Sequence, residues 1–159
     1  MTSREREIGA AVWDDDQIFF DAPDESIATR LWAEIAIQLL GEDAEATVSV
    51  DCDDPDTESR LRVAGFKVAE IEPEETVEVL DSVTVENEGR LRDLLDPVLR
   101  LRPDGPLGAL AIAGAAGVDF DAGAGIDVWG PGALAAARAA AASLGIAIRE
   151  RAPDSDDDP

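Results

Sequence analysis

The acidic run Asp51-Cys52-Asp53-Asp54 is the densest group of side chains in the sequence that could do chemistry. Carboxylate oxygens are the ligands that Mg²⁺ prefers, so one interpretation is a cation site made by Asp51, Asp53 and Asp54. The other interpretation is that Asp53 or Asp54 caps a helix in a protein that is acidic throughout, and the composition favours it. Cys52, the only cysteine, is similarly better interpreted as a buried small hydrophobe than as a nucleophile.

Arginines recur in pairs of the form Arg-x-Arg, which could hold an anion between them. Positions i and i+2 share a face on a strand, where two guanidinium groups could grip one phosphate or carboxylate, but they diverge on a helix. The pairs that remain as candidates for ligand binding are Arg100 with Arg102 and Arg149 with Arg151. The alternative is that each arginine pairs with the abundant acidic neighbours.

Residue types that are missing restrict the chemistry further. The sequence has no histidine and no tyrosine, which excludes Ser-His-Asp and Cys-His catalysis and metal ligation by histidine. One cysteine excludes an intrachain disulfide and the cysteine clusters of zinc or iron–sulfur sites. No glycine-rich phosphate-binding fingerprint occurs in a usable context. Any reaction must therefore use carboxylates, arginines, hydroxyls, Lys67, Cys52 or backbone amides.

Negative charge is spread along the whole chain. The formal net charge is −23, the pI is near 4.1, and Lys67 is the only lysine among 13 basic residues. Such a chain repels nucleic acid and anionic membranes, so neither is expected as a partner. In composition it resembles the proteins of salt-in halophilic archaea. No apolar run reaches the roughly 20 residues that span a bilayer, and Met1–Arg6 leads into no signal-peptide core, which predicts a cytoplasmic protein.

The acidic run separates a predicted strand from a predicted helix. The β-branched run Thr47–Val50 predicts the strand, and the helix begins near Pro55. Gly65 supplies the left-handed residue that ends this helix, and Phe66–Ile71 begins the next strand. Short connections predict that the two strands pair in parallel through a right-handed crossover. Ligands of such sheets collect beyond the carboxyl ends of the strands, which is where Asp51 lies.

The remaining segments predict further helices and strands. Ile27–Leu40 is the clearest helix, and its apolar stripe places Trp32 in the core. Asn87 caps a helix that ends before Pro97, an alanine-rich helix ends near residue 144, and Leu107–Ala113 fits either a strand or a helix. Further strands are predicted at Ile8–Trp13, Gln17–Phe20, Thr76–Val85, Val118–Phe120, Ile126–Trp129 and Ile146–Arg151.

Together these segments predict one α/β domain over residues 1–151, with a mixed sheet of about six or seven strands and helices packed on it. A turn rich in proline and glycine near residues 100–108 is the alternative boundary between two halves. The order strand, turn, helix, glycine and strand occurs twice, around residues 48–68 and 126–148, which suggests an internal duplication. The acidic residues 152–159 predict a disordered tail.

The central stretch, with the helix before it, resembles the C-terminal half of the GNAT acetyltransferase superfamily. That family has a motif of the form Asn-x-x-Ala-x-x-x-Tyr-x-x-x-Gly-Phe, and the residues in register with it here are Asp54, Thr57, Leu61, Gly65 and Phe66. A second segment matches the ending of this motif with Ala137, Ala141, Gly145 and Ile146. The resemblance implies a GNAT-like scaffold and, for a full member, acetyl-CoA as cofactor.

Two functional elements of that family are replaced in this sequence. Leu61 and Ala141 stand where the family has the tyrosine that serves as general acid. The turn before the long helix, Asp21–Ser26, has carboxylates that repel a pyrophosphate, whereas the family uses a glycine-rich turn. The resemblance therefore implies a degenerate relative that has kept the scaffold and lost the cofactor.

Two functional hypotheses follow. The first is a non-catalytic binding or adaptor domain with no cofactor, which recognises a protein partner or a small ligand, with a homodimer as a further expectation. The second is an enzyme, either an N-acetyltransferase that uses acetyl-CoA or a carboxylate-metal enzyme that uses Mg²⁺ at Asp51, Asp53 and Asp54.

Overall fold

Nine strands and four helices make up the part of the chain that the computed structural model describes, residues 7–21, 25–52, 54–68, 83–101, 108–121 and 125–151. The strands are β1 (Glu7–Asp14), β2 (Gln17–Phe20), β3 (Glu45–Cys52), β4 (Lys67–Val68), β5 (Val83–Arg90), β6 (Gly108–Ala113), β7 (Ala116–Asp121), β8 (Gly125–Trp129) and β9 (Ala147–Arg151). The helices are α1 (Glu25–Leu40), α2 (Pro55–Val63), α3 (Leu91–Leu99) and α4 (Ala133–Ser143).

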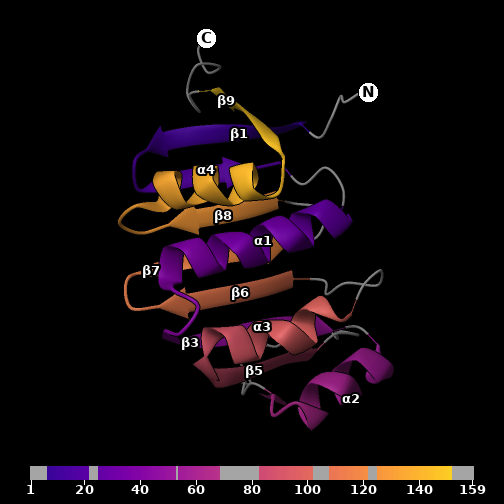
Figure 1. The fold of residues 1–159 in the computed structure, drawn as a ribbon. Helices are drawn as coiled ribbons and strands as arrows, with labels where there is room; N and C mark the ends of the chain where they lie inside the picture. Colours follow the sequence, from indigo (N-terminus) through magenta and orange to yellow (C-terminus); the bar gives the residue numbers. More distant parts are fainter. Residues whose placement is uncertain are drawn as a thin grey trace, which may run out of the picture.

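All nine strands belong to one mixed sheet, in the order β4-β5-β3-β6-β7-β8-β2-β1-β9 (Figure 1). Neighbouring strands are antiparallel except β1 and β9, which pair in parallel. The α/β class and the mixed sheet are confirmed, but the predicted six or seven strands are too few. The segment Leu107–Ala113, which fits either a strand or a helix, contains strand β6. The strand predicted to begin at Phe66–Ile71 is present as the two-residue edge strand β4.

Each helix connects two parallel strands that are not neighbours in the sheet. The sequence predicts that the strands before and after α2 pair directly. In the structure β3 and β4 are parallel, but β5 lies between them and pairs with both. Residues 45–113 therefore follow a β-α-β-β-α-β path with the strand order β4-β5-β3-β6, which is the ferredoxin-like arrangement.

Helix α1 forms the centre of the core, as its apolar stripe predicts. Leu31, Trp32 and Ile35 are fully buried, and burial of one aliphatic side chain of this size contributes about 2 kcal/mol. The indole nitrogen of Trp32 donates a hydrogen bond of 3.0 Å to the backbone carbonyl of Val118 in β7. Helix α1 is thereby attached to the middle strand of the sheet.

The predicted ends of α2 are confirmed. Asp54 is the N-cap, Pro55 is the first helical residue, and Gly65 follows the helix with a φ of +108°. The amide of Phe66 then donates to the carbonyl of Leu61 at 3.1 Å, which closes the helix end.

Helix α4 ends in the same way as α2, with a left-handed glycine and a closing backbone hydrogen bond. The sequence pattern that occurs twice in the chain corresponds to this shared helix end. Gly145 has a φ of +71°, and the amide of Ile146 donates to the carbonyl of Ala141 at 2.8 Å. The surroundings of the two segments differ, because one strand lies between β3 and β4, whereas β2 and β1 both lie between β8 and β9.

Helix α3 departs from its predicted limits at both ends. Asn87 lies in β5, and the helix begins at Leu91, where the amides of Leu91 and Arg92 donate to the carbonyls of Ala44 and Glu42. These carbonyls, from the loop between α1 and β3, replace a side-chain cap. The helix also continues past Pro97 and ends at Leu99. Burial of Val98 against the core favours this final turn.

In the part of the chain that the structure describes, no helix is both long enough and apolar enough to span a membrane. Several predictions concern residues outside that part: Asp53, Arg102, most of the turn before α1, the strand start at residues 76–82 and the acidic tail at 152–159.

A substitution at Gly125 tests how much the close packing around this glycine contributes to stability. Its φ is +125°, and an added Cβ would collide with the Phe20 carbonyl and lie 2.5 Å from the Phe19 ring. We expect Gly125→Ala to lower the free energy of unfolding by about 3 kcal/mol, measured by denaturant titration, because backbone strain and overpacking add.

Gly145→Ala is the matched control, because Gly145 also has a positive φ but nothing lies within 4 Å of an added Cβ. We expect it to cost about 1 kcal/mol. Equal losses for the two variants would show that the contacts around Gly125 do not contribute.

Candidate functional site

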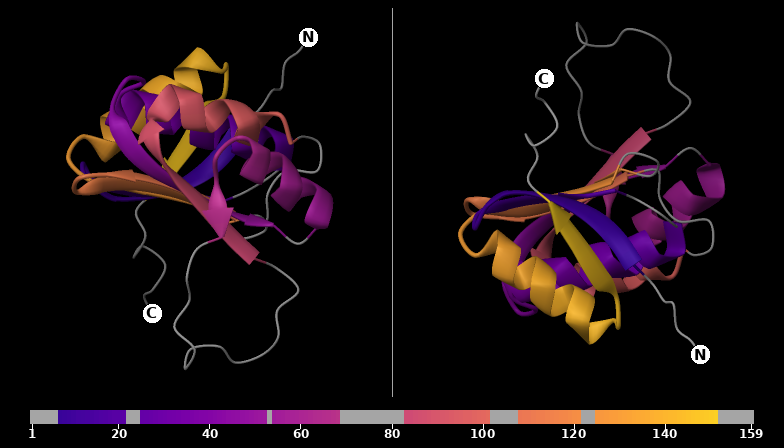
Figure 2. Two further views of the ribbon diagram at one scale, coloured as in Figure 1. Left: turned by 90° about the horizontal axis from the view of Figure 1, so that it is seen from below. Right: turned by 90° about the horizontal axis from the view of Figure 1, so that it is seen from above.

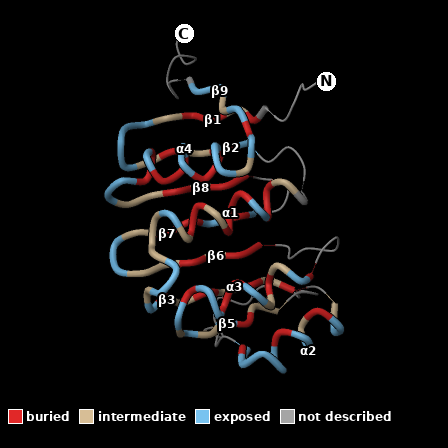
Figure 3. Tube along the Cα trace, in the orientation of Figure 1, coloured by how far each residue is buried: buried red, intermediate tan, exposed pale blue. Residues whose placement is uncertain are grey.

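One face of the sheet is covered by all four helices, and on the opposite face the described part of the chain places no helix (Figure 2). Successive side chains of a strand point to opposite faces, so every second residue lies on the uncovered side. In β3 the residues under the helices, such as Val48 and Val50, are fully buried, whereas Ser49 and Asp51 are partly exposed. The same alternation runs across the central strands (Figure 3). We call the uncovered side of β5, β3, β6, β7, β8 and β2 the open face.

Four large apolar side chains lie on the open face and remain partly exposed: Phe19, Leu110, Ile112 and Trp129. Two glycines let the aromatic rings lie flat on the sheet. An added Cβ at Gly117 would lie 2.5 Å from Trp129 Cζ2 and 2.6 Å from Ile112 Cγ2. The ring of Phe19 lies over Gly125 in the same manner. The open face thus has an apolar strip whose shape depends on the absence of two side chains.

Four carboxylates lie beside this strip, contributed by Asp51, Asp119, Asp121 and Asp127. Asp119 in β7 is directly opposite Asp127 in β8, and Gly108 in β6 is the register partner of both Asp51 and Asp121. The hydroxyl of Thr84 donates a hydrogen bond of 2.7 Å to Asp51 Oδ1, which orients that carboxylate. All ion pairs found between described residues lie elsewhere, and none includes these four aspartates.

The carboxylates repel one another. Partial burial of the Asp119 carboxylate raises its pKa above the ordinary value of 3.8, and the neighbouring charges of Asp121, Asp127 and Asp51 raise it further. Like charges directly opposite each other on a sheet are destabilising. A cation beside these carboxylates would relieve their repulsion, so the open face is suited to bind a positively charged group.

Two of the three residues proposed from the sequence as one cation site have different surroundings in the structure, and the third, Asp53, lies outside the described residues. Asp51 lies on the open face, whereas Asp54 caps α2 and accepts from the Thr57 hydroxyl at 2.8 Å, which lowers the pKa of Asp54. Cys52 is buried, as predicted. Among the described residues, no group of three or more histidine, cysteine, aspartate or glutamate side chains is placed to hold a metal ion.

Arg100 does not lie on a strand, which was the premise for pairing it with Arg102. It is the C-cap of α3 and forms an ion pair of 3.1 Å with Asp96. Arg149 does lie on a strand, β9, as predicted.

Three aspartates of the open face are absent from the candidates that the sequence suggested: Asp119, Asp121 and Asp127. A signal for them exists, because Val118-Asp119-Phe120-Asp121 and Ile126-Asp127-Val128 alternate apolar and acidic residues, the pattern of a strand with one acidic face. That these strands lie beside β3 and Asp51 follows only from the strand order.

Comparison with known proteins adds no further constraint, because no family model, curated protein or solved structure matches the chain. The chemistry of the open face therefore has to be inferred from its own side chains.

Because the pKa of Asp119 is raised, we expect the free energy of unfolding to depend on pH. The folded state binds the Asp119 proton more tightly than the unfolded state, so its contribution to stability is lost as the pH rises through the folded-state pKa. We expect Asp119→Asn to stabilise the protein at pH 7 by about 0.5 kcal/mol, since it removes the charge opposite Asp127. Thermal unfolding should show this gain shrinking as the pH falls toward 3.8.

Asp93→Asn is the control, because it makes the same change in net charge on α3. An equal gain for Asp93→Asn would show that only the overall charge matters and that the open-face carboxylates are not coupled.

Proposed function

We propose that this chain is a non-catalytic binding or adaptor domain whose open face binds a basic segment of a protein partner. The observation that carries the proposal is the apolar strip beside four carboxylates that have no ion-pair partner among the described residues. An acidic surface alone would suit a halophilic protein. Partly exposed tryptophan and phenylalanine rings next to unpaired charges are instead typical of an interface.

The two parts of the open face have different roles in this proposal. Trp129 and Phe19 are anchors, because aromatic rings contribute large contact areas at little cost in side-chain entropy. Asp119, Asp127 and Asp51 bind lysine or arginine side chains of the partner, since hydrogen bonds between ionised groups are stronger than neutral ones. Pairing with a cation also relieves the mutual repulsion that raises the pKa of Asp119.

The charge of the chain argues against its own acidic segments as occupants of the open face. Residues 69–82 and 152–159 contain acidic residues and no basic ones, so the open face would repel either segment. A second copy placed on the same face would bring carboxylates against carboxylates. A homodimer, which the sequence also suggests, would need a different surface.

The second candidate function is an enzyme, as the sequence also suggests. A GNAT-like scaffold and acetyl-CoA, or Mg²⁺ at Asp51, would make the chain an enzyme. Carboxylates are hard oxygen ligands of the kind that Mg²⁺ prefers, although the described residues contain no group of three or more placed to hold a metal ion. We place the protein in the cytoplasm of a halophilic organism, so the tests below use molar KCl.

A short peptide that alternates arginine and leucine tests the proposal. We expect the double variant Asp119→Asn/Asp127→Asn to bind this peptide about tenfold more weakly than the wild type, measured by fluorescence anisotropy, because two charged contacts are lost. The control Asp43→Asn/Asp93→Asn has the same net charge and should bind as the wild type does. Equal weakening in both variants, or equal binding of a leucine and glutamate peptide, would contradict the proposal.

A thermal-shift screen with acetyl-CoA and Mg²⁺ tests the enzyme alternative. The binding proposal predicts no rise in melting temperature with either ligand, since bound ligand would stabilise the folded state by mass action. A rise that Asp51→Ala abolishes would replace the binding proposal by an active site at the end of β3.

A further inference from the structure

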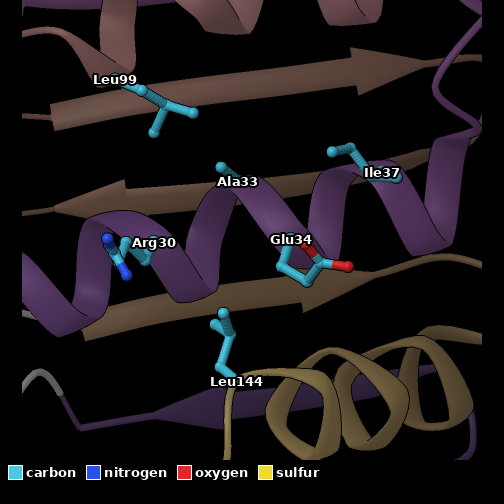
Figure 4. A pocket seen from close by; sticks show the side chains of 6 residues that line it. All are labelled: Arg30, Ala33, Glu34, Ile37, Leu99 and Leu144. Atoms are coloured by element: carbon cyan, nitrogen blue, oxygen red, sulfur yellow. The ribbon is translucent and has the colours of Figure 1, made fainter.

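A second candidate site lies on the helix side of the sheet, away from the open face. It is a hollow of about 280 Å³ over the outer surface of α1, lined by Arg30, Ala33, Glu34, Ile37, Leu99 and Leu144 (Figure 4). Leu99 is the last residue of α3, and Leu144 is the C-cap of α4. The two leucines lie on opposite sides of α1 in Figure 4, so that α1 is the floor of a groove between the other helices.

Four of the six residues that line this groove are apolar, and the other two are Arg30 and Glu34. Residues 30, 33, 34 and 37 of α1 are spaced i, i+3, i+4 and i+7, so they share one face of the helix. Ala33 is only 4% exposed, and its small side chain leaves the space that Ile37, Leu99 and Leu144 surround. The groove is comparable in volume to the smaller sites that hold small molecules and too small for a folded partner.

Among the residues that the structure describes, no carboxylate forms an ion pair with Arg30, which lines this groove. Other arginines of the described chain do form ion pairs, at 2.9 to 3.8 Å: Arg60, Arg62, Arg92, Arg100 and Arg138. Glu34, four residues after Arg30 on the same helix, accepts a hydrogen bond of 3.1 Å from the Gln38 amide instead. In Figure 4 the Arg30 and Glu34 side chains point toward opposite ends of the groove. A guanidinium without an ion-pair partner in the described part of the chain thus lies beside this hollow.

We infer that this groove binds a small monocarboxylate with an apolar body, whose carboxylate is held by Arg30. The planar guanidinium fork matches a carboxylate with two parallel hydrogen bonds, and the apolar body fills the space above Ala33. The net charge of −23 repels anions more strongly the more charges they have, which disfavours phosphates and nucleotides. Glu34 at the other end of the groove would repel a second anionic group. This inference does not depend on the proposed function of the open face.

Octanoate is the probe for this site, with octanol and octylamine as neutral and cationic analogues of the same length. The readout is a methyl NMR titration of the full chain in molar KCl. We expect saturable shifts of the methyl groups of Ala33, Ile37, Leu99 and Leu144 with octanoate. The neutral and cationic analogues should bind at least about tenfold more weakly, because a charge-assisted contact is missing.

Two variants separate the guanidinium contact from the general charge. Arg30→Gln should weaken octanoate binding about tenfold, whereas Arg90→Gln, the same change on β5, should leave it unaltered. Glu34→Gln should tighten binding, since it removes a repelling carboxylate. The methyl spectrum of Val118, beneath Trp32, reports that each variant is folded.

Three results would overturn the inference. These are the absence of saturable shifts, equal binding of octanoate to the Arg30→Gln variant and the wild type, and shifts confined to Leu110 and Ile112. The last result would assign the apolar ligand to the open face.

Discussion

The hydrogen bond from the Trp32 indole to the Val118 carbonyl attaches the central helix α1 to the middle strand of the sheet. Helix α1 leaves β2 and enters β3, so it must cross β8, β7 and β6, and Trp32 meets the sheet at β7, the middle strand. The side chain is fully buried, and an indole N–H without an acceptor there would cost about 1 to 3 kcal/mol. The packing of α3 and α4 on either side of α1 depends on this crossing.

Because all four helices lie on one side of the sheet, the other side is covered by the side chains of the strands themselves. Glycines make this feasible, since the Trp129 ring occupies the space above Gly117 and the Phe19 ring that above Gly125. These rings shield strand backbone that a helix would otherwise cover. The same arrangement leaves the rings partly exposed. The aromatic side chains that cover the strand backbone therefore also form part of the apolar strip of the open face.

Local signals in the sequence predicted the α/β class and most helices and strands, but neither the strand order nor the grouping of the open-face aspartates. The ends of α2 follow from Asp54, Pro55 and Gly65, whose types dictate a cap, a first turn and a left-handed end. The start of α3 could not be predicted in this way, because backbone carbonyls of a loop distant in the sequence accept from the amides of its first turn. The pairing of Asp119 with Asp127 similarly requires the register of β7 and β8, which alternation within either strand does not contain.

The open face and the α1 groove are proposed to bind ligands of opposite charge, although the chain as a whole is strongly negative. On the open face the unpaired carboxylates add to the net charge of −23, so long-range attraction concentrates any basic partner there before contact, and salt weakens that attraction. At the α1 groove the long-range field opposes the anion that Arg30 would bind. Only short-range contacts with the guanidinium and the apolar floor can then favour the ligand, and they act within the screening length of the salt. Salt should therefore weaken binding at the open face and assist the approach of an anion to the groove, so the two sites differ in the sign of their salt dependence.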